Sequence, residues 1–112
     1  MTHSLSIIIP TLNEEQTLRL SLDKLVKNID AGISPAEILI CDNGSTDKTL
    51  EVVRQVSEHD PRIRLISLPE RGPGRAFVAG VEAARGEYIV TLDADLSSDL
   101  NFIHYAQELL KY

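Results

Sequence analysis

The sequence predicts an α/β domain in which a mostly parallel, doubly wound sheet is built in the order βαβαβαβα. Four short runs rich in isoleucine, leucine and valine alternate with four segments whose apolar residues recur at helical spacing. Polar residues follow three of these runs directly, and the 112 residues suit one domain. Strands that alternate with helices form parallel sheets. Because right-handed crossovers bring the carboxyl ends of such strands to one edge, where ligands bind, we expect functional residues there.

The first strand is predicted at residues 5–9 and ends at Pro10, which has no backbone N–H. In the helix that follows, apolar residues fall on one stripe. They are Leu18, Leu22, Leu25, Val26 and Ile29. Thr11 or Asn13 is expected to cap this helix, and the acidic Glu14 and Glu15 suit its positive amino-terminal end.

The second and third strands are predicted at residues 37–41 and 63–67. In the helix between them, Leu50, Val53 and Val56 form the buried face, and each of residues 45–47 has a side chain that can cap it. The third strand alternates apolar and polar residues, so we expect it to be half exposed.

The third helix follows a glycine-rich turn at residues 69–74. Its inner face is expected to be mostly small, which allows close packing on the sheet; the residues are Ala76, Phe77, Gly80, Val81 and Ala84. Gly86 is predicted to cap its carboxyl end. The fourth strand spans residues 88–92, and a fourth helix is predicted after it with Phe102, Ile103, Ala106, Leu109 and Leu110 inward.

Composition narrows the function before any motif is considered. The net charge of −6 argues against a nucleic-acid partner and against a polybasic membrane anchor. No apolar run approaches the ~20 residues that a membrane-spanning helix requires. The single cysteine, Cys41, permits no internal disulfide and reads as a small buried thiol, which fits a reducing compartment. We therefore expect one cytoplasmic domain over residues 1–112.

Two aspartates directly follow the fourth predicted strand. Asp93 and Asp95 are two positions apart, so extended backbone places both carboxylates on the same side. Such oxygens suit Mg²⁺ or Mn²⁺, which take their remaining ligands from water and substrate phosphate. A solvated acidic loop is the ordinary alternative. Because polar residues after the first and second strands reach the same edge, we favour the metal site.

Two other features of that edge have a structural and a functional interpretation. Asp42, directly after the second strand, either accepts a hydrogen bond from a nucleobase or caps the second helix. The Gly72-Pro73-Gly74 segment either forms a tight turn or brings its backbone, together with Arg71, against a phosphate or base.

Five motifs occur together in a fixed order and spacing. They are PTLNE at residues 10–14, CDNGSTD at 41–47, RGPG at 71–74, AARGEY at 83–88 and LDADLS at 92–97. In this arrangement the chain resembles the donor-binding half of family 2 glycosyltransferases of the GT-A fold, with a particular likeness to dolichyl- and polyprenyl-phosphate sugar transferases. The resemblance runs from about Ser6 to Asp99. It implies a Rossmann-like domain that binds a nucleotide-diphospho-sugar.

The resemblance also implies a role for each motif in an inverting, metal-dependent sugar transfer. The nucleoside pocket would be lined by Pro10, Thr11, Leu12, Asn13 and Glu14. Asp42 would read the base, Arg71 and Gly74 would lie against the nucleotide, and Asp93 with Ala94 would approach the ribose. Asp95 would be the main ligand of Mg²⁺ or Mn²⁺ and Asp93 the second. These two residues would serve catalysis, since the metal would stabilise the leaving diphosphate.

The chain departs from the family pattern in two residues and in length. Asn43 stands where a second acid commonly follows Asp42, and Ser97 stands where the lipid-phosphate enzymes often have a glutamine. The family also continues beyond the metal acids into an acceptor-binding region. A lipid phosphate at a membrane surface would be an acceptor that needs no general base, because its oxygen is already anionic.

Two functional interpretations therefore stay open. One is a transferase donor-binding domain, reaching a membrane through its acceptor or a partner. The other is a non-catalytic nucleotide-binding or regulatory domain derived from a truncated transferase. A phospho-accepting receiver domain is disfavoured, because Pro10 and Thr11 follow the first strand where that class needs paired acids.

The resemblance implies the strand order third, second, first, fourth, which leaves residues 88–92 at an edge. This segment contains no charge, proline or glycine, and Ile89, Val90 and Leu92 are expected to add apolar surface. Unpaired edges of this kind invite pairing with another chain. We therefore predict a two-fold homodimer in which the two copies of this strand pair antiparallel.

Overall fold

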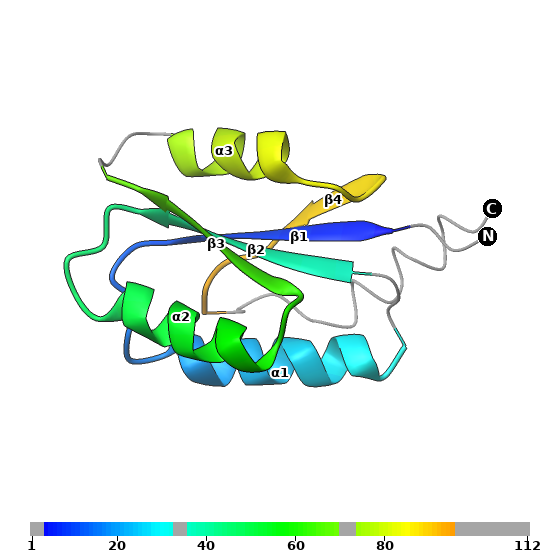
Figure 1. Cartoon of the computed structure of the whole chain (residues 1–112), viewed down its shortest axis with the longest axis horizontal. Helices are drawn as coiled ribbons and strands as arrows, with labels where there is room; N and C mark the ends of the chain where they lie inside the picture. Colours follow the sequence, from blue (N-terminus) through cyan, green and yellow to red (C-terminus); the bar gives the residue numbers. More distant parts are fainter. Residues whose placement is uncertain (1–3, 33–35, 70–73, 96–112) are drawn as a thin grey trace.

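A computed structural model of the chain describes residues 4–32, 36–69 and 74–95 (Figure 1). Its elements are β1 (Leu5–Thr11), α1 (Leu18–Asp30), β2 (Ala36–Asn43), α2 (Thr49–His59), β3 (Ile63–Leu68), α3 (Arg75–Ala83) and β4 (Tyr88–Thr91). Within these residues, four parallel strands form one sheet in the order β3-β2-β1-β4. The predicted α/β class, parallel sheet and strand order are confirmed. The predicted fourth helix lies outside the described residues.

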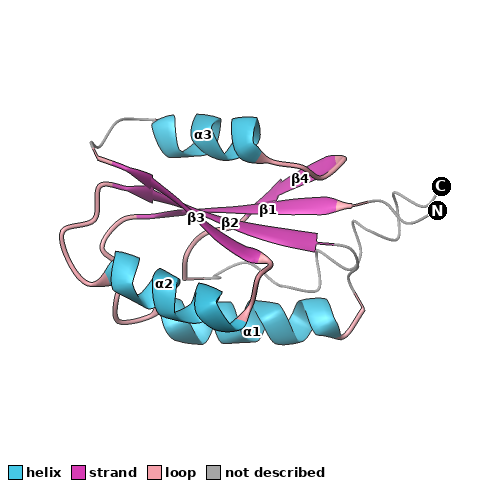
Figure 2. Ribbon diagram, in the orientation of Figure 1, coloured by secondary structure: helices cyan, strands magenta, loops and turns pink. Residues whose placement is uncertain are grey.

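Helices cover both faces of the sheet, with α1 and α2 on one side and α3 on the other (Figure 2). The larger core lies under α1 and α2, where Ile7 and Ile9 of β1 pack with Leu22 and Leu25 of α1. The smaller core lies under α3 and includes Ile8. Because successive side chains of a strand point to opposite faces, β1 supplies both cores and is buried along most of its length.

Two element boundaries differ from the prediction. β1 continues through Pro10 to Thr11, which pairs with Asp42 of β2. Proline removes one donor but keeps extended backbone and a carbonyl acceptor, so it does not end the strand. α1 begins at Leu18 with Thr17 at the N-cap, so the prediction that Thr11 or Asn13 caps this helix is wrong.

The start of α2 also differs from the expected cap. Its N-cap residue is Lys48, which lies one position beyond the predicted residues 45–47. Asp47 nevertheless contributes, since its Oδ1 accepts a hydrogen bond of 2.9 Å from the backbone N–H of Thr49, the first helical residue. The helix end is therefore stabilised by a side chain from just outside the helix.

The inner face of α3 is narrower than predicted. Ala76 and Gly80 face the sheet, whereas Phe77 and Val81 are 46% and 38% exposed, so their predicted inward placement is wrong. A Cβ on Gly80 would lie 2.9 Å from the Cys41 sulfur. Glycine lets the helix approach that closely, and the larger residues on either side are left at the surface. Burial of Cys41 raises the pKa of its thiol to about 11, in keeping with the predicted buried thiol.

Gly86 is not the C-cap of α3, because the helix ends at Ala83 and Ala84 takes that position. Gly86 has another structural requirement. A Cβ there would lie 2.7 Å from the backbone nitrogen of Ser6 and 2.8 Å from the carbonyl carbon of Leu5. The connection from α3 to β4 therefore crosses β1 in direct backbone contact, which a side chain would prevent.

β4 forms one edge of the sheet within the described residues, and its burial alternates strictly. Tyr88, Val90, Leu92 and Ala94 belong to the core under α1, whereas Ile89, Thr91, Asp93 and Asp95 are exposed. The expectation that Val90 and Leu92 add exposed apolar surface is wrong, since Leu92 is 5% exposed and Val90 is half-buried. Ile89 alone of the three is exposed, at 41%.

Candidate functional site

The loops that follow β1 and β2 are joined by hydrogen bonds at the carboxyl edge of the sheet. The Thr11 hydroxyl donates to Oδ1 of Asp42 over 2.7 Å. The backbone N–H of Asn13 donates to the Ser45 hydroxyl oxygen over 2.8 Å. The N–H of Glu14 donates to Oγ1 of Thr49 over 2.8 Å. The backbone of one loop is thus satisfied by side chains of the other, and both lie at the left of Figure 1.

Asn13 is the central residue of this junction. It has a left-handed backbone, with φ of 53°, a conformation that asparagine adopts more readily than most residues. Its side-chain oxygen accepts hydrogen bonds from the N–H groups of Thr46 and Asp47, over 2.8 and 3.3 Å. The residue therefore bends the first loop and at the same time holds the second.

Asp42 is fully buried, with 0% of its surface exposed. Its Oδ1 accepts hydrogen bonds from the hydroxyls of Thr11 and Ser45, and its Oδ2 accepts one of 2.9 Å from the Ser45 N–H. The carboxylate thus ties the end of β2 to the turn after it and to β1. Two carboxylate oxygens offer about four acceptor positions, so these three bonds leave capacity for another donor.

Asp47 lies at the outer side of the same junction. Partial desolvation opposes its ionisation, yet hydrogen bonds from the side chain and N–H of Thr49 and from the N–H of Glu15 hold the pKa of its carboxyl below its usual value. Asn13, Glu14 and Asp47 line an open cavity of about 340 Å³ together with residues 15–17. The charged carboxylate therefore remains at neutral pH beside a space that a polar group can enter.

Asp93 and Asp95 follow β4 and are both exposed, while Ala94 between them is 6% exposed. The Leu92 N–H donates to the Ile8 carbonyl over 2.9 Å, so the chain is still held to β1 immediately before the acids. Residues 94 and 95 lie in a turn rather than in extended strand, so the prediction that both carboxylates share one side stays a prediction.

The donor set fits a hard divalent cation that is completed by other ligands. Within the described residues, no group of three or more histidine, cysteine or acidic side chains is arranged to hold a metal ion. Two carboxylates with water and phosphate oxygens are an ordinary set for Mg²⁺, which seldom uses an all-protein cage. Asp93 and Asp95 match the number of carboxylates that such an ion ordinarily takes from a protein.

The other predicted site residues that the structure describes lie at or after the carboxyl ends of two strands, β1 and β3. Pro10 and Thr11 end β1, and Leu12, Asn13 and Glu14 form the loop after it. Gly74 lies after β3 as the N-cap of α3, where its φ of 74° favours glycine. Arg71 lies outside the described residues. Thr49 was missed from the sequence, because only its contact with the Glu14 N–H distinguishes it from any residue at the start of a helix.

Comparison with known proteins shows the family to which the chain is similar. The model of the family described as Glycosyl transferase family 2 matches residues 6–111. An uncharacterized glycosyltransferase of Haemophilus influenzae is 34% identical over 107 residues, which are 88% of this chain and 42% of that protein. The undecaprenyl-phosphate 4-deoxy-4-formamido-L-arabinose transferase of Photorhabdus laumondii is 34% identical over 95 residues, 83% of this chain and 29% of that protein.

The chain is also similar in structure to a solved glycosyltransferase. The mannosyltransferase PcManGT of Pyrobaculum calidifontis, in complex with GDP-Man and Mn²⁺, superposes with a TM-score of 0.83 at 29% identity, over 98% of this chain and 33% of that one. The chain thus spans less than half the length of each of these proteins. Where the structure describes the chain, no helix is long and apolar enough to cross a membrane.

The junction predicts a measurable stability effect of Asn13. Asn13→Gly removes the side-chain acceptor but tolerates the left-handed backbone, and should lower the free energy of unfolding by about 1–2 kcal/mol. Asn13→Ala removes the acceptor and also strains the backbone, so it should cost roughly 1 kcal/mol more. Urea denaturation of both variants measures the difference. An alanine variant as stable as the unchanged protein would show that the two loops do not depend on Asn13.

Proposed function

The chain belongs to glycosyl transferase family 2, and from this we propose that it binds a nucleotide-diphospho-sugar at the carboxyl edge of its sheet. The observation that carries the proposal is the arrangement of that edge. Hydrogen-bonded loops follow β1 and β2, and two exposed aspartates follow β4, the strand that pairs with β1 on its other side. One ligand with a base at one end and a diphosphate at the other suits these two groups.

The nucleoside is assigned to the loops. Its pocket would be lined by Pro10, Thr11, Leu12, Asn13 and Glu14. Backbone contacts to the nucleoside would come from those residues whose N–H groups do not already donate hydrogen bonds between the two loops. Asp42 would accept a hydrogen bond from the base after a shift of the Ser45 turn, because its carboxylate is fully buried in this arrangement of the loops. Gly74, whose Cα has open space beside it, and Arg71 would lie against the nucleotide.

The ribose is assigned to Asp93 and Ala94, and the diphosphate with its metal is assigned to Asp93 and Asp95. These carboxylates would hold Mg²⁺ or Mn²⁺, which when bound supplies positive charge to the leaving diphosphate. The relative from Pyrobaculum calidifontis is complexed with Mn²⁺ and GDP-Man, which supports a divalent cation and a nucleotide-sugar for this chain as well. The part of this protein is to present two exposed carboxylates directly after a strand that is anchored by its buried face.

The acceptor is proposed to be a polyprenyl phosphate. Its anionic oxygen would form the new bond to the anomeric carbon as the bond to the diphosphate breaks, with inversion, and no general base is needed. The undecaprenyl-phosphate sugar transferase of Photorhabdus laumondii supports this acceptor class. A non-catalytic nucleotide-binding domain is the competing function, and transfer of labelled sugar to a lipid phosphate separates the two.

Metal-dependent donor binding is the first consequence. GDP or UDP should bind in the presence of Mn²⁺ and weaken by at least about 100-fold in EDTA, since a metal contact to a diphosphate contributes several kcal/mol. Asp95→Ala should abolish the difference, whereas Asp23→Ala, which removes an exposed aspartate from α1, should not. Isothermal titration calorimetry measures both. Equal affinity of the unchanged protein with Mn²⁺ and with EDTA would refute the metal site.

We also propose that the chain forms a two-fold dimer through β4. Among the described residues, β4 pairs with β1 alone, and a strand at the edge of a sheet can pair with a strand of another chain. Exposed Ile89 supplies apolar surface beside that edge. Antiparallel pairing of two β4 strands would satisfy both edges by one symmetric contact.

A lysine at Thr91, an exposed residue of β4, should weaken this dimer, because a charged side chain on an edge strand disfavours pairing with another strand. Leu20→Lys is the matched control. Leu20 is 68% exposed on α1 and is not part of the strand that would form the dimer contact. Light scattering over a range of concentrations should show dissociation at lower concentration only for the Thr91 variant. A monomer at high concentration for the unchanged protein would exclude the dimer.

A further inference from the structure

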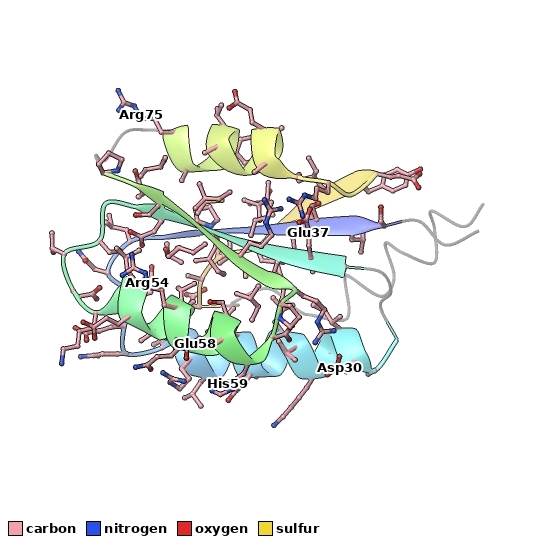
Figure 3. The ribbon with its side chains drawn as sticks, in the orientation of Figure 1. Asp30, Glu37, Arg54, Glu58, His59 and Arg75 are labelled. Carbon is pink, nitrogen blue, oxygen red and sulfur yellow. The ribbon has the colours of Figure 1, made fainter. Side chains whose placement is uncertain are left out.

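A second hydrogen-bonded cluster, centred on Glu37, lies at the amino-terminal ends of the strands, opposite the candidate site. Its Oε2 accepts hydrogen bonds of 2.6 Å from the Ser6 hydroxyl and from the backbone N–H of Arg85. Its Oε1 accepts one of 2.8 Å from the Arg64 guanidinium. Figure 3 shows this side chain between the start of β2 and the connection from α3 to β4. One carboxylate thus joins three strands to that connection.

Each backbone N–H from Arg85 to Tyr88 is used in this attachment. The Gly86 N–H donates to the Ser6 hydroxyl oxygen over 2.8 Å, and the Glu87 N–H donates to the Ser4 hydroxyl over 3.0 Å. The Tyr88 N–H donates to the Ser4 carbonyl over 3.1 Å. Short surface connections are usually satisfied partly by water. In this connection, each of the four backbone N–H groups donates to another residue of the protein.

Desolvation raises the pKa of Glu37, but hydrogen bonds from Ser6, Arg85 and Arg64 and the charge of Arg64 outweigh it, so the net pKa lies below its ordinary value. The carboxylate is therefore charged at neutral pH, and charge-assisted hydrogen bonds are the strong ones. Asp60 of the same edge makes a comparable ion pair of 2.8 Å with Arg62, but no hydrogen bond links it to the α3–β4 connection.

The attachment matters for the site because β4 is short and has a described partner on one side only. The paired residues run from Leu5–Tyr88 to Ile8–Thr91. A displacement of one residue would turn Tyr88 and Val90 outward and Ile89 and Thr91 inward, because the side chains of a strand alternate with period two, and it would move the acids that follow the strand. The connection enters β4 immediately before Tyr88, so it determines where along β1 the strand begins.

We propose that Glu37 is a positioning residue that, through Ser6, Arg85 and Gly86, holds β4 in the register that presents Asp93 and Asp95 at the opposite edge. The proposal rests on the proposed metal-dependent donor site for its functional consequence. The structural consequence, the hold on β4, is independent of any ligand.

Glu37→Gln tests the proposal, because glutamine keeps the size but replaces one oxygen with a donor that faces other donors. Amide hydrogen exchange should accelerate about tenfold at Leu92. Its N–H donates to the Ile8 carbonyl just after the end of β4 that lies away from Glu37. The amides of residues 39–41 in the centre of the sheet should keep their rates within about twofold. The Mn²⁺ concentration that gives half-maximal GDP binding should rise about fivefold.

Two further variants complete the experiment. Ser6→Ala removes the link between Glu37 and Gly86 and should act in the same direction. Asp60→Asn alters a carboxylate at the same edge and should leave both the Leu92 amide and the Mn²⁺ requirement unchanged. Should Glu37→Gln accelerate exchange uniformly or not at all, or leave the Mn²⁺ requirement as it was, the positioning role is wrong. If the unchanged protein binds no GDP with Mn²⁺, the donor site fails, and the exchange at Leu92 still decides the hold on β4.

Discussion

The hydrogen bonds between the loops after β1 and β2 are the constraint on which the candidate site depends. Thr17, the N-cap residue of α1, makes no side-chain capping hydrogen bond, and the N–H groups of Asn13, Glu14 and Glu15 all donate to side chains of the second loop or of the helix after it. A movement of one loop would break these bonds. It would also take partners from the fully buried Asp42, and an unsatisfied buried carboxylate is costly.

The sheet places the second part of the site by a different principle. Leu92 and Ala94 are buried in the core under α1, whereas Asp93 and Asp95 are exposed. Their height along the sheet is determined by the pairing of β4 with β1 and by the attachment at Glu37. The burial of Leu92 and Ala94 therefore accompanies the exposure of the two aspartates. The hydrogen bonds around Glu37 determine their position along the sheet.

The sequence predicted these features unequally, for physical reasons. The spacing of apolar residues is local, so the four strands and their positions along the chain were predicted correctly to within a few residues. The helix caps were predicted wrongly because Asn13 and Asp47 form bonds across loops that lie far apart in the chain. Phe77 and Val81 were assigned to the core since helical spacing does not reveal that α3 contacts the sheet through Gly80. Gly86 was read as a cap, whereas a close approach of backbones, invisible in a pattern, requires it.

The central claim is that the loops after β1 and β2 and the acids after β4 form one site for a nucleotide-diphospho-sugar. Amide NMR spectra of the labelled chain with GDP-mannose and trace Mn²⁺ test it most directly, because Mn²⁺ broadens the signals of nearby nuclei. The account predicts broadening centred on residues 93–95, together with nucleotide-dependent shifts at residues 11–14 and 42–46. Broadening or shifts confined to other residues, such as those around Arg62 at the opposite edge, would contradict it.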